Sequence, residues 1–352
     1  MIKNLYQRHG IKAEVRDYQE RICEKSFNFL NTGNSVMIES PTGSGKSCMA
    51  MTTAKLLEDA YPGLRVGWAT MRRNNLAQAE RENSDKGFNL DLKLISMFDK
   101  NPPEVDLLIV DEGHHDSTTS MNRIHYISKP KFVMGATATP VRADKAALFF
   151  KKTVRDANTR YLVKQGYLAQ FNHFSIPDWE PSTVADIYCR DKKKWGKSAI
   201  FFRTLGECED CAYFLRSNGV KVEIVTGESD RDAQLAQFEN GDVDVIVNMM
   251  VLTEGYDNPR MQSVFCRPST QGPSKQMIGR VMRRNGNMVK NVIQSANTKW
   301  EFTKEADALG TFKIHNGIWV PVKDKGDLME QEISNSLATL SKIAQGLVID
   351  KK

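Results

Sequence analysis

The chain has 352 residues, of which 40% are hydrophobic and 26% charged, and its formal net charge is +6. This length exceeds one ordinary core and suggests two domains plus a remainder. The chain has no apolar run near the ~18 residues of a membrane span, and its first residues, MIKNLYQRHGIK, lack a signal-peptide core. These features argue against a membrane or secreted protein and predict a cytoplasmic location.

Six cysteines are scattered over a chain long enough not to need disulfides, which is typical of a reducing compartment. Cys208 and Cys211 form a C-x-x-C pair with no second ligand pair at zinc spacing. We expect both thiols to pack on a helix face, with a zinc site as the alternative. Basic clusters at 151–152, 192–194 and 283–284 permit a polyanionic partner, but charge runs are more often solvated surface.

The first strong helical pattern runs from Arg16 to about Leu30. A glutamine near its start, Gln19, can pair with the N6 and N7 edge of adenine, although alone it would be an ordinary surface residue. The interpretation of Gln19 as an adenine contact gains support only from the segment that follows.

Residues 36–50, VMIESPTGSGKSCMA, combine a short apolar strand, a glycine-rich loop and the start of a helix. Backbone N–H groups of such a loop face an anion, Lys46 adds a positive charge over the terminal phosphates, and the Ser47 hydroxyl can bind Mg²⁺. The pattern G-x-x-x-x-G-K-[ST] fails only at its first position, Ser40, and the alternative is an ordinary turn before a helix. The expected phosphate ligands are Thr42, Gly43, Ser44, Gly45, Lys46 and Ser47.

Apolar segments then alternate with helical ones, which predicts a mostly parallel sheet covered by helices on both faces. In such a sheet functional groups gather at the carboxyl ends of the strands, where this reading places Thr70, Asp111 and Thr137. The predicted strands are 66–70, 92–96, 105–110 and 132–137, with a helix at 72–81.

Two adjacent carboxylates follow the third of these strands. Asp111 is placed to hold the Mg²⁺ of a bound nucleotide, and Glu112 to orient or deprotonate a water. Acidic residues at a strand end are common, but together with a phosphate loop about 65 residues earlier they predict a nucleotide triphosphatase. The hydroxyls of Thr137 and Thr139 can link this pair to regions beyond the sheet, or can simply end a strand.

The alternation of apolar and helical segments is interrupted after the first domain and resumes in a second one. We expect a linker at 166–197, with a hinge between Ser175 and Lys197 where prolines occur and apolar residues are few. A second sheet without a phosphate loop follows, which suggests a nucleotide held in the cleft between two domains. Its predicted strands are 199–202, 222–225 and 243–247, with helices at 207–217 and 231–238.

The second domain contains the helical segment QMIGRVMRR, in which Arg280 and Arg283 lie three residues apart on one face. They can present two guanidinium groups to a γ-phosphate, and the alternative is two solvated arginines on a basic helix. A hairpin at 312–320 with an Asn-Gly turn and a final helix at 328–344 are predicted in the tail.

The motifs RDYQ, PTGSGKS, WATMRRN, DEGHH, GATATP, TEGYDNP and QMIGRVMRR occur here in the order found in superfamily 2 helicases. The chain resembles the branch with XPB-like and RadD-like helicases and the motor subunits of type I and type III restriction enzymes. The resemblance covers about residues 16–284 and implies an α/β fold with two RecA-like parallel-sheet domains in tandem and a short C-terminal α+β tail. The expected parts are an ATP-binding domain at 1–165, the linker at 166–197, a helicase C-terminal domain at 198–295 and a tail at 296–352.

The resemblance also implies roles for single residues. Lys46 and Ser47 would hold phosphates and Mg²⁺, Asp111 would bind Mg²⁺, and Glu112 would activate water. Gly113 stands where many relatives carry alanine, a change expected not to harm the chemistry. The remaining implied roles are adenine contact by Arg16 and Gln19, domain coupling by His114 and Gln276, coupling of hydrolysis to movement by Thr137 and Thr139, nucleotide contact by Gly255 and Asp257, arginine fingers at Arg280 and Arg283, and nucleic-acid contact by Arg72, Arg73 and Thr226.

The predicted function is that of a monomeric, Mg²⁺- and ATP-dependent helicase or translocase that moves along or remodels nucleic acid. DNA is preferred over RNA by family analogy alone. The tail shows no zinc module, so a protein partner could direct the enzyme to its substrate. The alternatives are a translocase subunit that separates no strands and acts through a nuclease or repair partner, an RNA helicase, and a P-loop kinase or switch without a nucleic-acid role.

Overall fold

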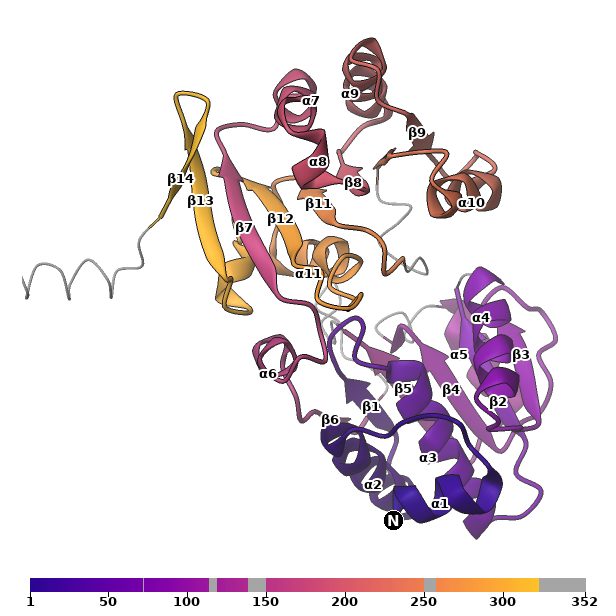
Figure 1. Ribbon diagram of the computed structural model, residues 1–352. Helices are drawn as coiled ribbons and strands as arrows, with labels where there is room; N and C mark the ends of the chain where they lie inside the picture. Colours follow the sequence, from indigo (N-terminus) through magenta and orange to yellow (C-terminus); the bar gives the residue numbers. More distant parts are fainter. Residues whose placement is uncertain (72, 114–118, 139–149, 250–257, 323–352) are drawn as a thin grey trace, which may run out of the picture.

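The computed structural model describes residues 1–71, 73–113, 119–138, 150–249 and 258–322. It contains two α/β domains, each built on one sheet (Figure 1). All strand pairs are parallel except the pair formed by the last two strands of the described part. This confirms the predicted fold class.

The first sheet has six strands in the order β3-β2-β4-β5-β1-β6. Its strand β1, which precedes the phosphate loop, lies between β5 and β6. The elements of this part are α1 (Ile2–His9), α2 (Asp17–Asn31), β1 (Val36–Glu39), α3 (Lys46–Ala60), β2 (Val66–Thr70), α4 (Arg73–Asp85), β3 (Leu92–Ser96), β4 (Leu107–Asp111), α5 (Thr119–Ser128), β5 (Phe132–Thr137), β6 (Lys152–Val154) and α6 (Thr159–Lys164).

The second sheet has eight strands in the order β14-β13-β7-β12-β11-β8-β10-β9. Its elements are β7 (Phe171–Ile176), α7 (Pro181–Arg190), α8 (Lys192–Trp195), β8 (Ser198–Phe201), α9 (Leu205–Ser217), β9 (Val222–Val225), α10 (Arg231–Asn240), β10 (Val245–Asn248), β11 (Ser263–Cys266), α11 (Gln271–Gly279), β12 (Lys290–Ser295), the 3-10 helix η3 (Phe302–Lys304), β13 (Gly310–His315) and β14 (Ile318–Pro321).

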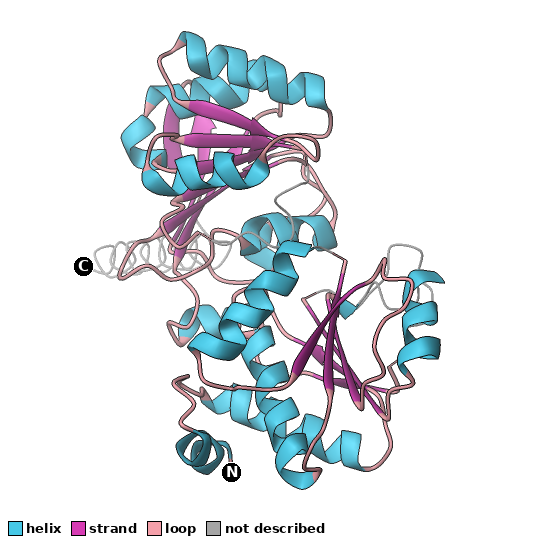
Figure 2. Ribbon diagram, turned by 90° about the vertical axis from the view of Figure 1, so that its right-hand side faces the viewer, coloured by secondary structure: helices cyan, strands magenta, loops and turns pink. Residues whose placement is uncertain are grey.

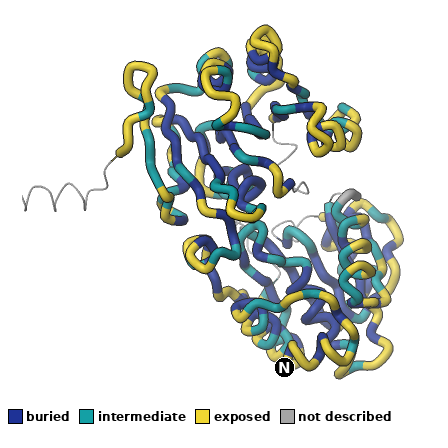
Figure 3. Tube along the Cα trace, in the orientation of Figure 1, coloured by how far each residue is buried: buried dark blue, intermediate teal, exposed yellow. Residues whose placement is uncertain are grey.

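Successive residues of the central strands are buried on opposite faces of the sheet. Leu107 and Ile109 of β4 belong to the core cluster shared with α2 and α3, whereas Leu108 and Val110 pack with α5. Helices therefore cover both faces, which explains the continuous apolar runs of these strands. Figure 2 shows the helices around the sheets, and Figure 3 shows the central strands buried and the outer helices partly exposed.

The segment expected to be a linker contributes structure to the second domain instead. Residues 171–176 form β7, which pairs with β12 on one side and β13 on the other. The predicted hairpin forms at β13 and β14, and it extends this same sheet rather than standing apart as a tail. The chain that joins the two sheets is thus the stretch between β6 and β7, which corrects the expected hinge position.

Cys208 and Cys211 lie on α9 and are fully buried, as expected for a packed helix face. Within the described ranges, no group of three or more potential ligands is placed to hold a metal ion. No helix of the described part is long and apolar enough to cross a membrane. The final helix predicted at 328–344 lies outside the described residues.

Candidate nucleotide site between the two domains

The phosphate loop is a tight turn that requires glycine at two positions. Gly43 and Gly45 have φ values of 82° and 86°, in the left-handed region that favours glycine. A Cβ atom on Gly45 would lie 2.6 Å from Nε2 of Gln19, and one on Gly43 would lie 3.0 Å from Cδ2 of Leu168. The loop is therefore held close to its neighbours on both sides.

The first turn of α2 fixes this loop. The hydroxyl of Tyr18 and the Nε2 of Gln19 both donate to the carbonyl of Ser44, at 2.6 and 2.8 Å. The Oε1 of Gln19 accepts from the backbone N–H of Arg16 at 3.0 Å. The Gln19 amide thus already supports the loop, and because an amide nitrogen carries two hydrogens, one remains for another acceptor.

Lys46 begins α3 and lies among four other charged groups. Burial lowers its pKa, the carboxylates of Glu112 and Asp111 oppose this shift, and the guanidinium groups of Arg280 and Arg283 add to it. These groups come from the start of α3, the end of β4 and the region after α11. The structure brings them together at the phosphate loop.

The acidic pair lies at the end of β4. Burial and the charge of Glu112 raise the pKa of Asp111 to about 7, and Lys46 opposes the shift. Oδ1 of Asp111 accepts from the backbone N–H of Glu112 at 3.1 Å, and Oε2 of Glu112 accepts from the hydroxyl of Thr137 at 3.3 Å. Glu112 has a φ of 52°, a left-handed conformation that is uncommon for a residue with a side chain.

The helix that precedes the two arginines packs directly on the phosphate loop. A Cβ atom on Gly279 would lie 2.6 Å from the Cβ of Thr42. The side-chain methylenes of Arg283 lie 3.9 Å from the position of a Cβ on Gly43, and Arg280 is only 9% exposed. Both arginines thus lie at the seam between the domains, on the phosphate-loop side.

The positions of the other predicted site residues give less information about their roles. Gln276 lies on α11, four residues before Arg280 and on the same face. The Thr226 hydroxyl accepts from the N–H groups of Glu228 and Ser229, at 3.2 and 3.1 Å, so it stabilises a turn after β9. Ser47 lies in the first turn of α3, and Arg73 begins α4. The remaining calls, Arg72, His114, Thr139, Gly255 and Asp257, lie outside the described residues.

A cavity of about 430 Å³ lies beside the phosphate loop but is lined by a different set of residues from those that converge on Lys46. Its walls come from both domains and from the connecting stretch, and they include Ser40, Thr42, Thr159, Lys275, Gly279 and Glu305. The carboxylate of Glu305 accepts from Thr159 at 2.9 Å and pairs with Lys275 at 2.8 Å. It therefore joins the connecting stretch to the second domain.

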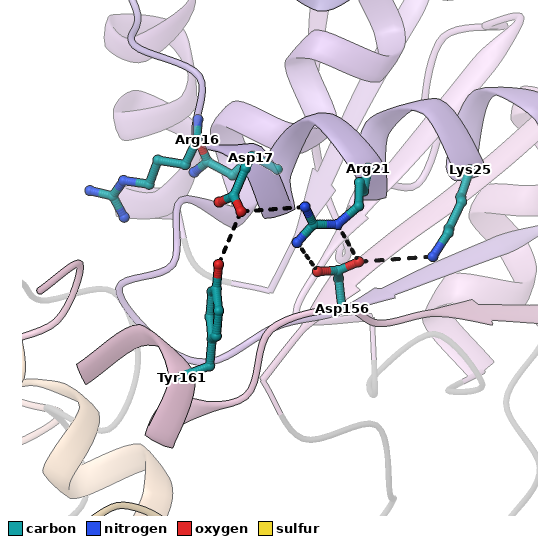
Figure 4. A network of polar contacts seen from close by, with 7 residues as sticks. Arg16, Asp17, Arg21, Lys25, Asp156 and Tyr161 are labelled. Atoms are coloured by element: carbon teal, nitrogen blue, oxygen red, sulfur yellow. Dashed lines mark hydrogen bonds and ion pairs between the residues drawn. The ribbon is translucent and has the colours of Figure 1, made fainter. Parts of the chain in front are cut away.

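The connecting stretch is also fastened to the first domain, as Figure 4 shows. Asp156 receives two hydrogen bonds from Arg21, at 2.9 and 2.6 Å, and an ion pair from Lys25 at 3.8 Å. Asp17 accepts from Tyr161 at 3.0 Å. The sequence analysis missed these residues because the partners lie up to 144 positions apart and no local pattern marks them.

Two family models match the chain. The helicase conserved C-terminal domain matches residues 179–285, and the type III restriction enzyme res subunit matches residues 12–86 and 95–142. With the fold and the convergent site, these matches define the class: two helicase-type domains that share one candidate nucleotide site. The chain belongs to the superfamily 2 helicases, in the branch that includes restriction-enzyme motor subunits.

The individual relatives of this chain have low sequence identity to it. The 51.5 kDa protein of a Lactococcus phage (isolate 7-9) is 26% identical over 274 residues, which cover 66% of this chain and 59% of that protein. The putative ATP-dependent helicase IRC3 of Saccharomyces cerevisiae is 22% identical over 342 residues, covering 76% of this chain and 49% of the relative. The chain thus spans about half the length of these relatives.

The fold is also found in a solved restriction-enzyme fragment. A putative HsdR subunit of a type I restriction enzyme from Vibrio vulnificus YJ016 superposes with a TM-score of 0.65 at 17% identity, covering 90% of this chain and 75% of that one. At this identity the likeness shows the fold alone.

Proposed function

We propose that this chain hydrolyses ATP between its two domains and couples the reaction to movement along, or remodelling of, nucleic acid, with DNA as the preferred substrate. The observation that carries the proposal is the convergence of Lys46, the acidic pair and two arginines of the other domain on one loop. Such a site is complete only when both domains contribute. Hydrolysis and domain movement are therefore linked.

In this proposal the phosphate loop, from Thr42 to Gly45, holds the phosphates through backbone N–H groups, and Lys46 neutralises their charge. Ser47 and Asp111 would hold Mg²⁺, and the raised pKa of Asp111 fits this role because a carboxylate buried beside another acid is stabilised by a cation. The metal supplies charge neutralisation at the transferred phosphate. Glu112 orients and deprotonates the attacking water.

The second domain completes the site. Arg280 and Arg283 stabilise charge that develops on the γ-phosphate, a contribution worth about 10³ to 10⁵ in rate for arginine fingers. Gln276, together with His114, passes the state of the nucleotide between the domains, and Thr137 and Thr139 transmit it across the first sheet. Arg16 and Gln19 contact adenine. Gly255 and Asp257 contact the nucleotide from the second domain, and Arg72, Arg73 and Thr226 contact the nucleic-acid backbone.

Lys46→Ala tests the proposal. We expect nucleic-acid-stimulated ATP turnover to fall by about 10² or more, because one fixed positive charge at the transferred phosphate is lost. Lys193→Ala, which removes the same charge from an exposed position on α8, is the matched control. Turnover by Lys46→Ala near the wild-type rate would refute the proposed site.

A second set of assays identifies the nucleic-acid substrate and distinguishes strand separation from translocation alone. Turnover measured with single-stranded, duplex and branched DNA and with RNA identifies the nucleic acid. The match to a restriction-enzyme res subunit favours DNA and also favours the second candidate, a translocase that separates no strands and acts through a partner. Displacement of a triplex-forming strand without unwinding of a forked duplex would support that candidate, and robust unwinding by the isolated monomer would contradict it.

A further inference from the structure

One carboxylate, that of Glu305, joins two other parts of the molecule at the wall of the cavity beside the phosphate loop. Its Oε1 accepts from the hydroxyl of Thr159 at 2.9 Å, and its Oε2 pairs with Nζ of Lys275 at 2.8 Å. Thr159 begins α6 in the connecting stretch, and Lys275 lies on α11. These three residues form the Glu305 cluster, to which the proposed function gives no role. Both Thr159 and Glu305 lie outside the segments that match the family models.

Glu305 is fixed to the second domain. Its N–H donates to the carbonyl of Phe302 at 2.8 Å, and Phe302 is only 2% exposed. The N–H of Phe302 donates to Oε1 of Gln294 in β12 at 2.8 Å, and its ring contacts that of Phe171 in β7, with centroids 5.1 Å apart. The Glu305 carboxylate therefore moves with the second sheet.

Thr159 is fixed to the first domain. Asp156 and Tyr161, on either side of it in the chain, are both hydrogen-bonded to side chains of α2 (Figure 4). The first turn of α2 also holds the phosphate loop. The hydrogen bond between Thr159 and Glu305 thus connects a segment attached to the first domain with one attached to the second.

The contacts of the Glu305 cluster are shielded from solvent. The side chains of Glu305 and Lys275 are 16% and 26% exposed, and Thr159 is 6% exposed. The neighbouring ion pair of Arg160 and Asp307 has side chains that are 50% and 77% exposed. Because water weakens an exposed pair, the shielded carboxylate contributes more to holding the domains together than Asp307 does.

Lys275 extends the cluster to the helix that leads to the arginines of the site. It directly precedes Gln276, and α11 ends at Gly279, immediately before Arg280. Gly279 in turn packs against Thr42 of the phosphate loop. A contact that holds α11 to the connecting stretch therefore favours the arrangement in which the arginines reach the loop.

We propose that Glu305 is a positioning residue that stabilises the closed arrangement of the two domains by holding the connecting stretch and α11 together. The inference rests on the proposed function and adds a residue that sets how often the nucleotide site is complete. The bond between Glu305 and Thr159 must break when the domains separate. A chain that is closed for a smaller fraction of the time binds ATP more weakly in the same proportion.

The first test compares KM for ATP with kcat. Glu305→Gln keeps the size of the side chain and loses its charge, and Thr159→Val loses the hydroxyl donor. In each variant KM for ATP should rise about tenfold, as expected for one lost hydrogen bond to a charged group. At saturating ATP and nucleic acid the ligands themselves hold the domains together, so kcat should stay within about twofold of wild type.

Asp307→Asn is the matched control. It removes a carboxylate two residues further along the chain, from the exposed pair with Arg160, and should leave KM and kcat at their wild-type values. Thr159→Val is nearly isosteric, so it keeps the test decisive if Glu305→Gln does not fold.

A double-mutant cycle shows whether both partners act through Glu305. In a Glu305→Ala background, Thr159→Val and Lys275→Met should change KM by less than about twofold, because their shared partner is already absent. Effects of the same size in both backgrounds would overturn the proposal.

Limited trypsin digestion gives a readout that does not depend on ATP turnover. Arg160 and Lys164 lie on α6, and loss of the Thr159 contact should release this helix from the second domain. Without nucleotide, cleavage after these two residues should be about threefold faster or more in Thr159→Val than in wild type. Mass spectrometry locates the cleavage sites, and an unchanged rate would contradict the role of the Glu305 cluster.

The outcomes separate the two hypotheses. If Lys46→Ala turns over ATP at the wild-type rate, the proposed function fails, and the cleavage rates still test the Glu305 cluster. If Lys46→Ala is inactive while Glu305→Gln and Thr159→Val keep the wild-type KM, or lose kcat at an unchanged KM, the positioning role of Glu305 is refuted and the proposed function stands.

Discussion

The contact between Gly279 and Thr42 gives the most direct prediction about how the two domains cooperate. A Cβ atom on Gly279 would lie 2.6, 2.9 and 3.0 Å from Cβ, Oγ1 and Cγ2 of Thr42. Carbon atoms pack best at about 3.5 Å or more, so Gly279→Ala must move α11 away from the phosphate loop by about 1 Å.

The displacement of α11 also shifts the two arginines of the site. Arg280 follows Gly279 directly as the C-cap of α11, and Arg283 lies three residues further in the bend after it, so both are expected to be displaced with the end of the helix. A misplacement of about 1 Å can cost up to 10² in rate. We therefore expect kcat for ATP to fall by about 10- to 100-fold. The change occurs at a seam between domains, which can open without repacking a core, so Tm should stay within about 4 °C of wild type.

The assay is steady-state ATP turnover with saturating nucleic acid, together with a thermal melt of each variant. The matched control is Gly272→Ala on the same helix, where an added Cβ meets nothing within 4 Å. This control should keep full activity, because its added Cβ would contact no neighbouring residue. A Gly279→Ala variant with wild-type kcat would show that the observed contact plays no part in the active arrangement.

Three other changes follow from the geometry of the first domain. Gly113→Ala should destabilise the fold by about 1–3 kcal/mol in urea titrations, because its Cβ would lie 2.7 Å from Cε of Met37 and 3.2 Å from Cα of Gly135. The same exchange should cost less when it is made in a Met37→Ala background, and an equal cost in both backgrounds would contradict the packing argument. Asp111→Asn should alter the pH profile of the metal-free protein. Burial raises the pKa of Asp111 from 3.8 to about 7, so the folded state binds this proton more tightly than the unfolded chain, and wild type should lose stability as pH rises through that window. Melts in EDTA should thus show Asp111→Asn more stable than wild type at pH 8 and level with it near pH 4, and a constant difference would refute the shift. Asp156→Asn should cost about 1 kcal/mol, since it removes an acceptor of a two-bond pair with the partly exposed Arg21; unchanged urea unfolding would show that the pair adds nothing.

Much of the fold could be predicted because it is encoded in short segments. Strands β2, β3, β5 and β9 begin and end where their apolar runs do. The phosphate loop and the acidic pair follow directly from such strands. The two arginines were predicted on one helix face, but α11 ends at Gly279, so Arg280 and Arg283 approach Lys46 from the turn after the helix. Local patterns therefore fixed where each group lies along its own element.

Strand β7 could not be predicted in this way. Its sequence, FNHFSI, contains polar residues and is followed by a proline, features typical of a linker or an edge strand. In the structure it is buried between two strands that come more than 100 residues later. His173 is accommodated because its Nε2 and Oε1 of Gln294 hydrogen-bond at 3.1 Å. Only the tertiary partner makes this strand possible.

The packing around Gly113 could not be predicted from sequence. An exchange of glycine for alanine is small in volume, and from sequence it was expected not to harm the chemistry. Here the side chain of Met37 occupies the space that an alanine methyl group would need. The cost of the exchange thus depends on a neighbour from another strand, which sequence spacing does not reveal.

The contacts of the connecting stretch indicate with which domain it moves. Asp156 is held by Arg21 through two hydrogen bonds and is 15% exposed at its side chain. On the other side, Thr159 donates to Glu305 at 2.9 Å. Arg160 and Asp307 also form an ion pair, but their side chains are 50% and 77% exposed, so this pair contributes little. From Ala169, whose N–H donates to the carbonyl of Met282, the chain belongs to the second domain. Gly166, whose φ of 69° lies in the left-handed region that favours glycine, comes just before this point, and we expect the chain to bend there during a cycle of ATP hydrolysis.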